Sequence, residues 1–238
     1  MLISDSWRPS AKQVTLPNDN SSAGPEAFRA EREAMVEQHL RRRGIHDERV
    51  LAAMKMVPRH EFVRGPDWPE AYADHPVPIA EQQTTSQPYI IAAMLQASEI
   101  KPCDRVLEIG AGSGYQTAVL AELAGHVFAI ERYPTLVDSA RQVLDRLGYH
   151  NIALVAGDGS MGLAQAAPYD VIIVSAAAPR VPPILMEQLA SGGRMVIPVG
   201  DAGQQILKLV RNHGDHISET NLEGCRFVPL IGQAGFGE

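Results

Sequence analysis

The stretch Arg105-Val-Leu-Glu-Ile-Gly-Ala-Gly-Ser-Gly114 decides the fold of this chain. Val106, Leu107 and Ile109 form a short apolar run, as in a buried strand, and glycines follow at every second position. Residues 115–124 then have the apolar spacing of a helix. A strand, a glycine turn and a helix open a βαβ nucleotide-binding unit, whose bare backbone and helix start suit a phosphate or carboxylate. The alternative is a tight turn without a ligand.

Acidic residues end the next two predicted strands. Glu131 closes a second apolar run and comes 21 residues after Gly110, where an acid can accept hydrogen bonds from ribose hydroxyls. Asp158 and Gly159 follow a third apolar run. Parallel strands end at one edge of a sheet, and ligands bind at that edge in open α/β sheets. We therefore expect these strand ends to meet around one ligand.

The same alternation of strand and helix patterns continues along the chain. We predict an α/β fold, with a Rossmann-like, mostly parallel sheet flanked by helices, N-terminal helices and an antiparallel C-terminal strand pair. Residues 1–25 are predicted to be a mobile tail, and residues 26–238 a single domain. Outside the central unit the expected helices are 26–43, 47–56, 89–98, 134–147 and 182–190, and the expected strands are 169–178, 194–199, 205–210 and 225–230.

Composition narrows the class of protein. The chain has 238 residues, 45% hydrophobic content and a net charge of −7, which argues against a nucleic-acid partner because phosphate binding needs a basic face. No apolar stretch approaches the roughly 20 residues of a membrane helix, and no signal-peptide pattern opens the chain. Cys103 and Cys225 have no metal-site spacing. We expect a cytoplasmic protein without a membrane partner or a metal.

Several motifs together resemble a known family. The glycine loop, Glu131 and Asp158-Gly159 resemble the cofactor site of class I S-adenosylmethionine-dependent methyltransferases. More specific segments are similar to the protein-L-isoaspartate O-methyltransferases, namely Val57-Pro-Arg-His-Glu-Phe-Val63, Thr84-Thr-Ser-Gln-Pro-Tyr89 and Leu107-Glu-Ile-Gly-Ala-Gly-Ser-Gly-Tyr-Gln-Thr117. The resemblance covers about residues 30–230, and its most specific part is the Thr-Ser-Gln-Pro segment.

The resemblance implies a protein repair enzyme. Such an enzyme transfers a methyl group from S-adenosylmethionine to the free carboxylate of L-isoaspartyl residues in damaged proteins and peptides. It implies Ser86 as the active-site residue, and we expect a monomer. The cofactor-binding residues that it implies are Thr84, Thr85, Gly110, Gly112, Gly114, Glu131, Asp158 and Gly159.

The chemistry of this reaction predicts simple roles for those residues. A carboxylate with a pKa near 4 is ionised at neutral pH, so it can attack the methyl group without a general base. We therefore expect no catalytic His or Lys. Ser86 would aim the acceptor carboxylate, Glu131 would bind the ribose hydroxyls and Asp158 the adenine amino group. The alternative for Ser86 is a plain helix N-cap hydroxyl.

One departure from the family pattern keeps other functions open. Ala80 and Gln82 stand where the family usually has glycine, and a side chain at Gln82 could shift the loop or crowd a backbone approach. The alternatives are a small-molecule methyltransferase and a catalytically silent cofactor-binding module on the same scaffold. A nicotinamide dehydrogenase is disfavoured because the glycines are spaced GxGxG rather than GxGxxG. Methyl transfer to an isoaspartyl peptide, but not to its aspartyl twin, separates these functions.

Overall fold

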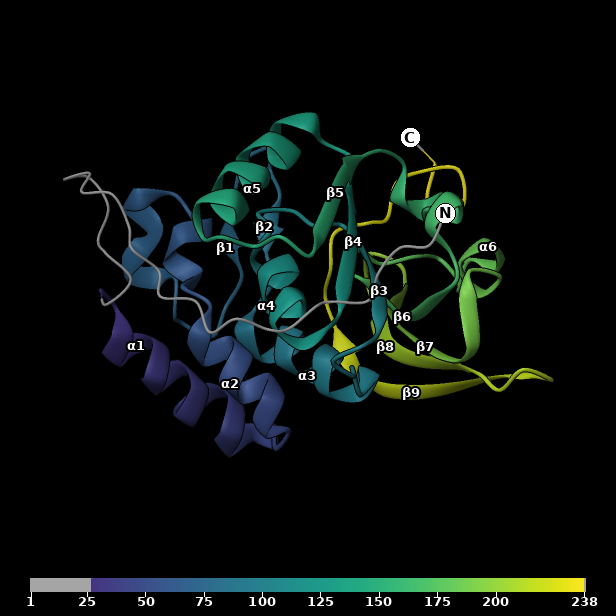
Figure 1. The fold of residues 1–238 in the computed structure, drawn as a ribbon, viewed down its shortest axis with the longest axis horizontal. Coiled ribbons are helices and arrows are strands. Elements are labelled where there is room, and N and C mark those ends of the chain that lie inside the picture. The colour runs from purple at the N-terminus through teal and green to yellow at the C-terminus, as the bar shows by residue number, and fades with distance from the viewer. Residues whose placement is uncertain (1–26, 238) are drawn as a thin grey trace, which may run out of the picture.

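The computed structural model describes residues 27–237, so the predicted tail 1–25 lies outside the described residues. A seven-stranded sheet forms the centre, with helices on both faces (Figure 1). Its strands are β3 Arg105–Ile109, β4 His126–Glu131, β5 Ile152–Ala156, β6 Tyr169–Val174, β7 Leu189–Gly200, β8 Gln205–Asn212 and β9 Ile217–Cys225. The helices are α1 Arg29–Ala34, α2 Glu48–Met56, α3 Pro88–Ser98, α4 Tyr115–Leu123, α5 Pro134–Arg146 and α6 Pro183–Met186.

The order of the strands confirms the predicted fold class. The sheet runs β5-β4-β3-β6-β7-β8-β9, with parallel pairing from β5 to β7 and antiparallel pairing from β7 to β9. The chain moves outward from β3 to β5 and then returns to β6, on the other side of β3. Ligands of open α/β sheets bind at such a reversal, outside the carboxyl ends of the strands. The gap between the ends of β3 and β6 is therefore where a ligand is expected.

Each face of the sheet carries its own apolar core. Val106, Val127 and Val171 point to the face that packs against helices α2, α3 and α4 (Figure 1). Leu107 and Ile172 point to the opposite face, whose core also includes side chains from α6 and the C-terminal segment. The alternation of neighbouring residues between faces follows from the two-residue period of a strand. Burial on both faces explains why the parallel strands read as continuous apolar runs.

The N-terminal helices follow the predicted boundaries closely. The predicted helix 26–43 is divided into α1, a π-helical stretch Met35–Leu40 and a 3₁₀ turn Arg41–Arg43, and Gly44 ends it with φ of 96°. Asp47 caps α2 as predicted, because its carboxylate accepts hydrogen bonds from the backbone N–H groups of Arg49 and Val50. Within the described residues, no helix is both long and apolar enough to span a bilayer.

Two predicted elements near the C-terminus are corrected by the structure. The helix expected at 182–190 is only the single turn α6, because β7 already begins at Leu189. The partner of β8 is β9 rather than residues 225–230. Strand β9 is a mostly exposed edge strand with a polar sequence, so it lacks the apolar run on which the prediction relied. Residues 226–231 are therefore free to run back across the sheet (Figure 1).

Candidate active site

The glycine loop that follows β3 has a backbone conformation that residues other than glycine rarely adopt. Gly110, Gly112 and Gly114 have φ of 85°, 55° and 86°. The backbone N–H groups of Gly110 and Ala111 both donate to the carbonyl of Ile130, at 2.8 and 3.2 Å, which ties the loop to β4. A Cβ on Gly114 would lie 3.0 Å from the Cβ of Ala140, so this glycine also lets α4 begin close to α5.

Glu131 fixes the other side of this loop. Its side chain is buried, one carboxylate oxygen accepts the Gly112 N–H at 2.9 Å, and the other accepts the Tyr133 N–H at 3.1 Å. A carboxylate has about four acceptor sites, so these two hydrogen bonds leave capacity for a ligand. Glu131 therefore orders the glycine loop and still presents acceptors at the strand end, as ribose hydroxyls require.

A cavity opens where the ends of β3, β4 and β6 meet. It combines bare glycine backbone, apolar walls and one buried acid. The lining consists of Gln83, Thr84, Ile109, Gly110, Gly112, Ile130, Glu131, Arg132, Tyr133, Gly159, Ser175, Ala176, Val228, Pro229, Leu230 and Ile231.

The structure brings together part of the predicted site. The predicted residues that line the cavity are Thr84, Gly110, Gly112, Glu131 and Gly159. The predicted residues outside the lining are Ser86, Thr85, Gly114 and Asp158. Gln82, where a side chain could crowd the cavity, is exposed and outside the lining as well. The departure at this position therefore leaves the cavity open.

Arg59 fixes the short strand β2, Thr84–Thr85, and the Ser86 that follows it. This side chain is fully buried, and its guanidinium donates to the carbonyl of Ser86 at 2.8 Å and to the hydroxyl of Thr85 at 3.2 Å. The Thr85 hydroxyl is thus directed toward Arg59 and away from the cavity. Thr84 lines the cavity, and Ser86 directly follows β2, two positions after Thr84.

Asp74 caps the N-terminus of α3 with its side chain. Its carboxylate accepts the backbone N–H of Tyr89 at 3.2 Å and the side-chain amide of Gln87 at 2.8 Å, and it also pairs with Arg43. The N-cap residue of α3 is Gln87, with no side-chain capping hydrogen bond. The plain N-cap role considered for Ser86 is therefore not what the structure contains.

The C-terminal segment completes the cavity and clasps Asp158. One carboxylate oxygen of Asp158 accepts the Gln233 N–H at 2.9 Å, and the other accepts the hydroxyl of Ser160 at 2.7 Å. Burial alone would raise the pKa of Asp158, but these hydrogen bonds outweigh burial and hold that pKa below its ordinary value. Asp158 is therefore an ionised anchor for the segment that supplies Val228–Ile231 to the lining.

Sequence reasoning missed the lining residues that follow β6 and β9. The strand expected at 169–178 ends at Val174, so Ser175 and Ala176 directly follow β6, with Ser175 next to Gly110, at the strand end where ligands bind in α/β sheets. Val228–Ile231 carry no such signal, because the predicted strand 225–230 covers all of them except Ile231. Their backbone is fixed to the end of β6 by hydrogen bonds from Ala177 N–H to Val228 and from Leu230 N–H to Ala177.

A buried acid lies beneath the glycine loop. Glu108 is completely buried and accepts hydrogen bonds from the Thr117 hydroxyl at 2.5 Å and the Gln116 amide at 3.1 Å. Burial raises the pKa of Glu108 to about 8, although these two hydrogen bonds oppose the shift. Glu108 is therefore mostly protonated at neutral pH and adds little negative charge under the cavity.

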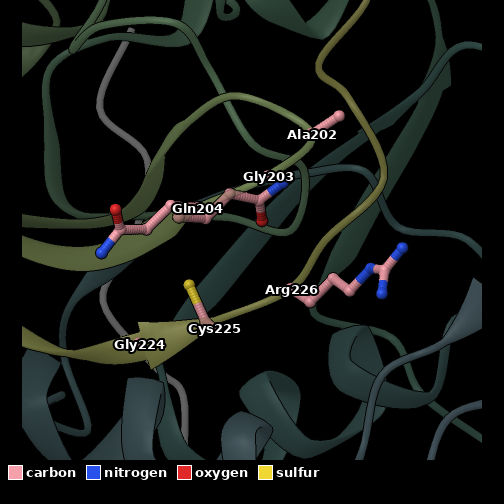
Figure 2. A pocket seen from close by; sticks show the side chains of 7 residues that line it. Ala202, Gly203, Gln204, Gly224, Cys225 and Arg226 are labelled. Atoms are coloured by element: carbon pink, nitrogen blue, oxygen red, sulfur yellow. The ribbon is translucent and has the colours of Figure 1, made fainter.

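A second cavity opens beside the β7–β8 turn. Figure 2 shows Gln204 and Cys225 on facing sides, while Arg226 extends away from both. The lining contains no acid that could bind a ribose and no strand-to-helix glycine loop. Among the described residues, no cluster of His, Cys, Asp and Glu is arranged to hold a metal. The first cavity is therefore the candidate active site.

Comparison with known proteins agrees with this geometry. The family model described as Protein-L-isoaspartate(D-aspartate) O-methyltransferase (PCMT) matches residues 30–235. A protein-L-isoaspartate O-methyltransferase of Koribacter versatilis is 55% identical over 209 residues, which cover 88% of this chain and 94% of that protein. The chain belongs to the protein-L-isoaspartate O-methyltransferase family. A further relative, protein-L-isoaspartate O-methyltransferase 1 of Syntrophobacter fumaroxidans, is 51% identical and covers 88% of this chain and 98% of its own.

Solved structures of isoaspartyl methyltransferases have the same fold. One protein-L-isoaspartate O-methyltransferase superposes with a TM-score of 0.77 at 28% identity, covering 86% of this chain and 67% of its own. A putative Plasmodium falciparum homologue, in complex with S-adenosyl-L-homocysteine, superposes with a TM-score of 0.74 at 27% identity, covering 84% and 97% of the two chains. As a family member, this chain is a methyltransferase that uses S-adenosylmethionine and acts on isoaspartyl carboxylates.

The first cavity fits that cofactor. Ile109, Ile130 and Leu230 provide buried apolar walls for a base, and Glu131 provides acceptors for ribose hydroxyls. The glycine loop leaves room for close approach of a ligand to the backbone. The Glu131 carboxylate favours a positive charge nearby, as a sulfonium carries.

Proposed function

We propose that the first cavity performs isoaspartyl methylation, with Ser86 orienting the acceptor carboxylate. The main support is position, since Ser86 follows Thr84 of the cavity lining by two residues and its backbone carbonyl is fixed by the buried Arg59. Capping of α3 by Asp74 leaves the Ser86 hydroxyl available for a substrate. Thr84, Gly110, Gly112, Glu131 and Gly159 then form the cofactor contacts.

The remaining predicted cofactor residues receive supporting roles. Thr85 links Arg59 to the strand, and Gly114 lets α4 approach α5. Asp158 holds the C-terminal wall and retains acceptor capacity for an adenine amino group at Oδ2, which accepts only the Gln233 N–H, whereas Oδ1 accepts two hydrogen bonds from Ser160. Each residue thus contributes to the cofactor site either by contact or by holding a wall of it.

The chain's own residues supply position rather than acid–base chemistry. Bound S-adenosylmethionine supplies an electrophilic methyl group on a sulfonium, and the acceptor carboxylate is already ionised at neutral pH. Ser86 donates a hydrogen bond that aims one carboxylate oxygen, while Arg59 keeps the strand in place. The apolar walls exclude water. Correct alignment of two bound reactants supplies up to about 7–11 kcal/mol in favourable cases, so no basic residue is required.

The role of Ser86 is tested by Ser86→Ala. We expect kcat for an isoaspartyl peptide to fall by about one to two orders of magnitude, as for loss of one hydrogen bond to a charged group. The dissociation constant of S-adenosylhomocysteine, measured by calorimetry, should stay close to that of the wild type. An equal loss of cofactor affinity would assign Ser86 to cofactor binding instead.

The role of Glu131 is tested by Glu131→Ala. Removal of a buried acceptor that orders Gly112 and faces the ribose should weaken S-adenosylhomocysteine binding by at least about tenfold. Calorimetry on this variant, with its unfolding midpoint as a check on folding, gives the result directly. A normal dissociation constant would contradict the assignment.

We also propose that the enzyme is a cytoplasmic monomer that acts on isoaspartyl proteins and peptides without a nucleic-acid partner. The net charge of −7 supports the last point. The domain is proposed to comprise residues 26–238, with 1–25 as a tail. Light scattering should give a mass near 25.8 kDa, and a mass twice as large would refute the monomer.

A further inference from the structure

The hydroxyl of Ser175 is arranged as a hydrogen-bond donor at the floor of the cofactor cavity. Ser175 follows β6 directly and lines the cavity, at the reversal of strand order beside β3. Its backbone N–H donates to the carbonyl of Ile109 at 2.8 Å, which fixes its position next to the glycine loop. A Cβ built on Gly110 would lie 3.6 Å from Ser175, so the two residues are in contact distance.

A buried amide determines what this hydroxyl can do. The side-chain amide of Gln116, on the first turn of α4, donates to the Ser175 oxygen at 2.8 Å. The same amide nitrogen donates to Glu108 at 3.1 Å, and both Gln116 and Glu108 are buried. The buried Glu108 carboxyl group thus fixes the Gln116 amide nitrogen beneath the glycine loop. The Ser175 oxygen therefore already accepts a hydrogen bond from protein.

The proton of the Ser175 hydroxyl remains available to the cavity. A serine hydroxyl has one donor and two acceptor sites, and the Gln116 amide occupies an acceptor site. Within residues 27–237, no acceptor for the Ser175 hydroxyl proton is recorded, and the side chain is only half-buried, at the cavity wall. A ligand oxygen at this position would accept that hydrogen bond without displacing any protein contact.

We propose that Ser175 is a carboxylate-binding residue of the active site, in addition to Ser86. This inference depends on the proposed function, because the reaction brings two carboxylates to this cavity. One belongs to the amino-acid part of the cofactor and the other is the isoaspartyl acceptor. A hydroxyl that donates and is not ionised suits either anion. Charge-assisted hydrogen bonds of this kind are about twice as strong as neutral ones.

The test compares Ser175→Ala with Ser175→Thr, which keeps the hydroxyl. Ser139→Ala is the matched control, because Ser139 is exposed on α5 and its hydroxyl donates to the carbonyl of Thr135. Calorimetry measures binding of S-adenosylhomocysteine and of 5′-methylthioadenosine, which lacks the amino-acid carboxylate. Steady-state kinetics give kcat/KM for an isoaspartyl peptide at saturating cofactor. The unfolding midpoint of each variant confirms that it is folded.

We expect Ser175→Ala to lose about tenfold in one of two measurements. Weaker binding of S-adenosylhomocysteine with unchanged binding of methylthioadenosine identifies the cofactor carboxylate as the ligand. A lower kcat/KM for the peptide with unchanged binding of both nucleosides identifies the acceptor carboxylate. In either case Ser175→Thr should remain within about threefold of the wild type, and Ser139→Ala should match it.

Other results would overturn the inference. Equal weakening of both nucleosides would mean that the hydroxyl shapes the cavity and does not bind a carboxylate. Values for Ser175→Ala within twofold of the wild type in every measurement would mean that the hydroxyl has no ligand. These results differ from failure of the proposed function, in which the wild type itself would not bind S-adenosylhomocysteine or methylate the peptide.

Discussion

Glu108, buried beneath the active site, makes the free energy of unfolding depend on pH. Its carboxyl group is completely enclosed, and burial raises its pKa to about 8, against about 4.5 in the unfolded chain. Between these pH values the folded protein holds a proton that the unfolded chain has released. The free energy of unfolding therefore decreases as pH rises through this window, by at most about 1.4 kcal/mol per pH unit from this group, and is constant above it.

Glu108→Gln should remove this pH dependence. Glutamine has the shape of the neutral acid and can still accept from Gln116 while its own amide faces Thr117. We expect the variant to be progressively more stable than the wild type as pH rises from 5 to 8, and the difference to level off above about 8. Urea denaturation at several pH values measures it. Glu187→Gln, at an exposed position, is the control, and parallel profiles for the wild type and Glu108→Gln would contradict the prediction.

The hairpin β1–β2 is the element that covers the glycine loop. Its strands are Val77–Pro78 and Thr84–Thr85, and Ile79 lies 3.5 Å from where a Cβ on Gly112 would be. The turn between the strands contains two non-glycine residues, Glu81 and Gln82, both with φ of 57°. Left-handed conformations cost L-residues roughly 1–2 kcal/mol each. The turn keeps this conformation partly because Glu81 accepts a hydrogen bond from Thr135 on α5, at 2.5 Å.

Gln82→Gly should relieve part of that cost. Glycine adopts positive φ readily, and the Gln82 side chain is exposed, so no packing is lost. We expect a gain of about 1 kcal/mol in the free energy of unfolding, measured by chemical denaturation. Gln204→Gly serves as control, because Gln204 is also an exposed turn residue but is absent from the residues with positive φ. Destabilisation of the Gln82 variant would refute the strain argument.

The C-terminal segment joins distant parts of the protein around the cofactor cavity. It starts at the edge strand β9, crosses the end of β6 and reaches Asp158 beyond β5. Gly232 passes so close to this acid that a Cβ there would be 2.0 Å from its carboxylate oxygen. The last part of the described chain is therefore a wall of a site whose floor is built from β3, β4 and β6.

Gly232→Ala should loosen that wall. The added methyl group must displace either the segment or Asp158, at a cost of about 1–3 kcal/mol in the free energy of unfolding. We also expect weaker binding of S-adenosylhomocysteine by calorimetry, because Val228–Ile231 line the cavity. A Cβ on Gly237 would meet nothing within 4 Å, so Gly237→Ala is the matched control. Equal cofactor affinities in the two variants would show that the wall is not needed.

Prediction from the sequence succeeded where a short sequence pattern is compatible with only one local backbone structure. The apolar strand, the glycine turn and Glu131 identified the sheet and one side of the cavity, because positive φ and strand burial are associated with recognisable residue types in a sequence. The same reasoning could not find Val228–Ile231, whose role depends on contacts with residues more than 50 positions away. It also could not find Asp74 as the cap of α3, because Asp74 lies 15 residues before Tyr89, whose backbone N–H donates to its carboxylate.

The position of the cavity wall also sets the order of events during translation. A nascent chain that has reached β8 already contains the glycine loop, Glu131 and Ser175, but it lacks Val228–Ile231. The cofactor cavity of such a chain is open on one side, and Asp158 lacks the hydrogen bond from the Gln233 N–H. Coenzyme capture by the complete cavity therefore requires that Val228–Ile231 have been synthesised and packed against the end of β6.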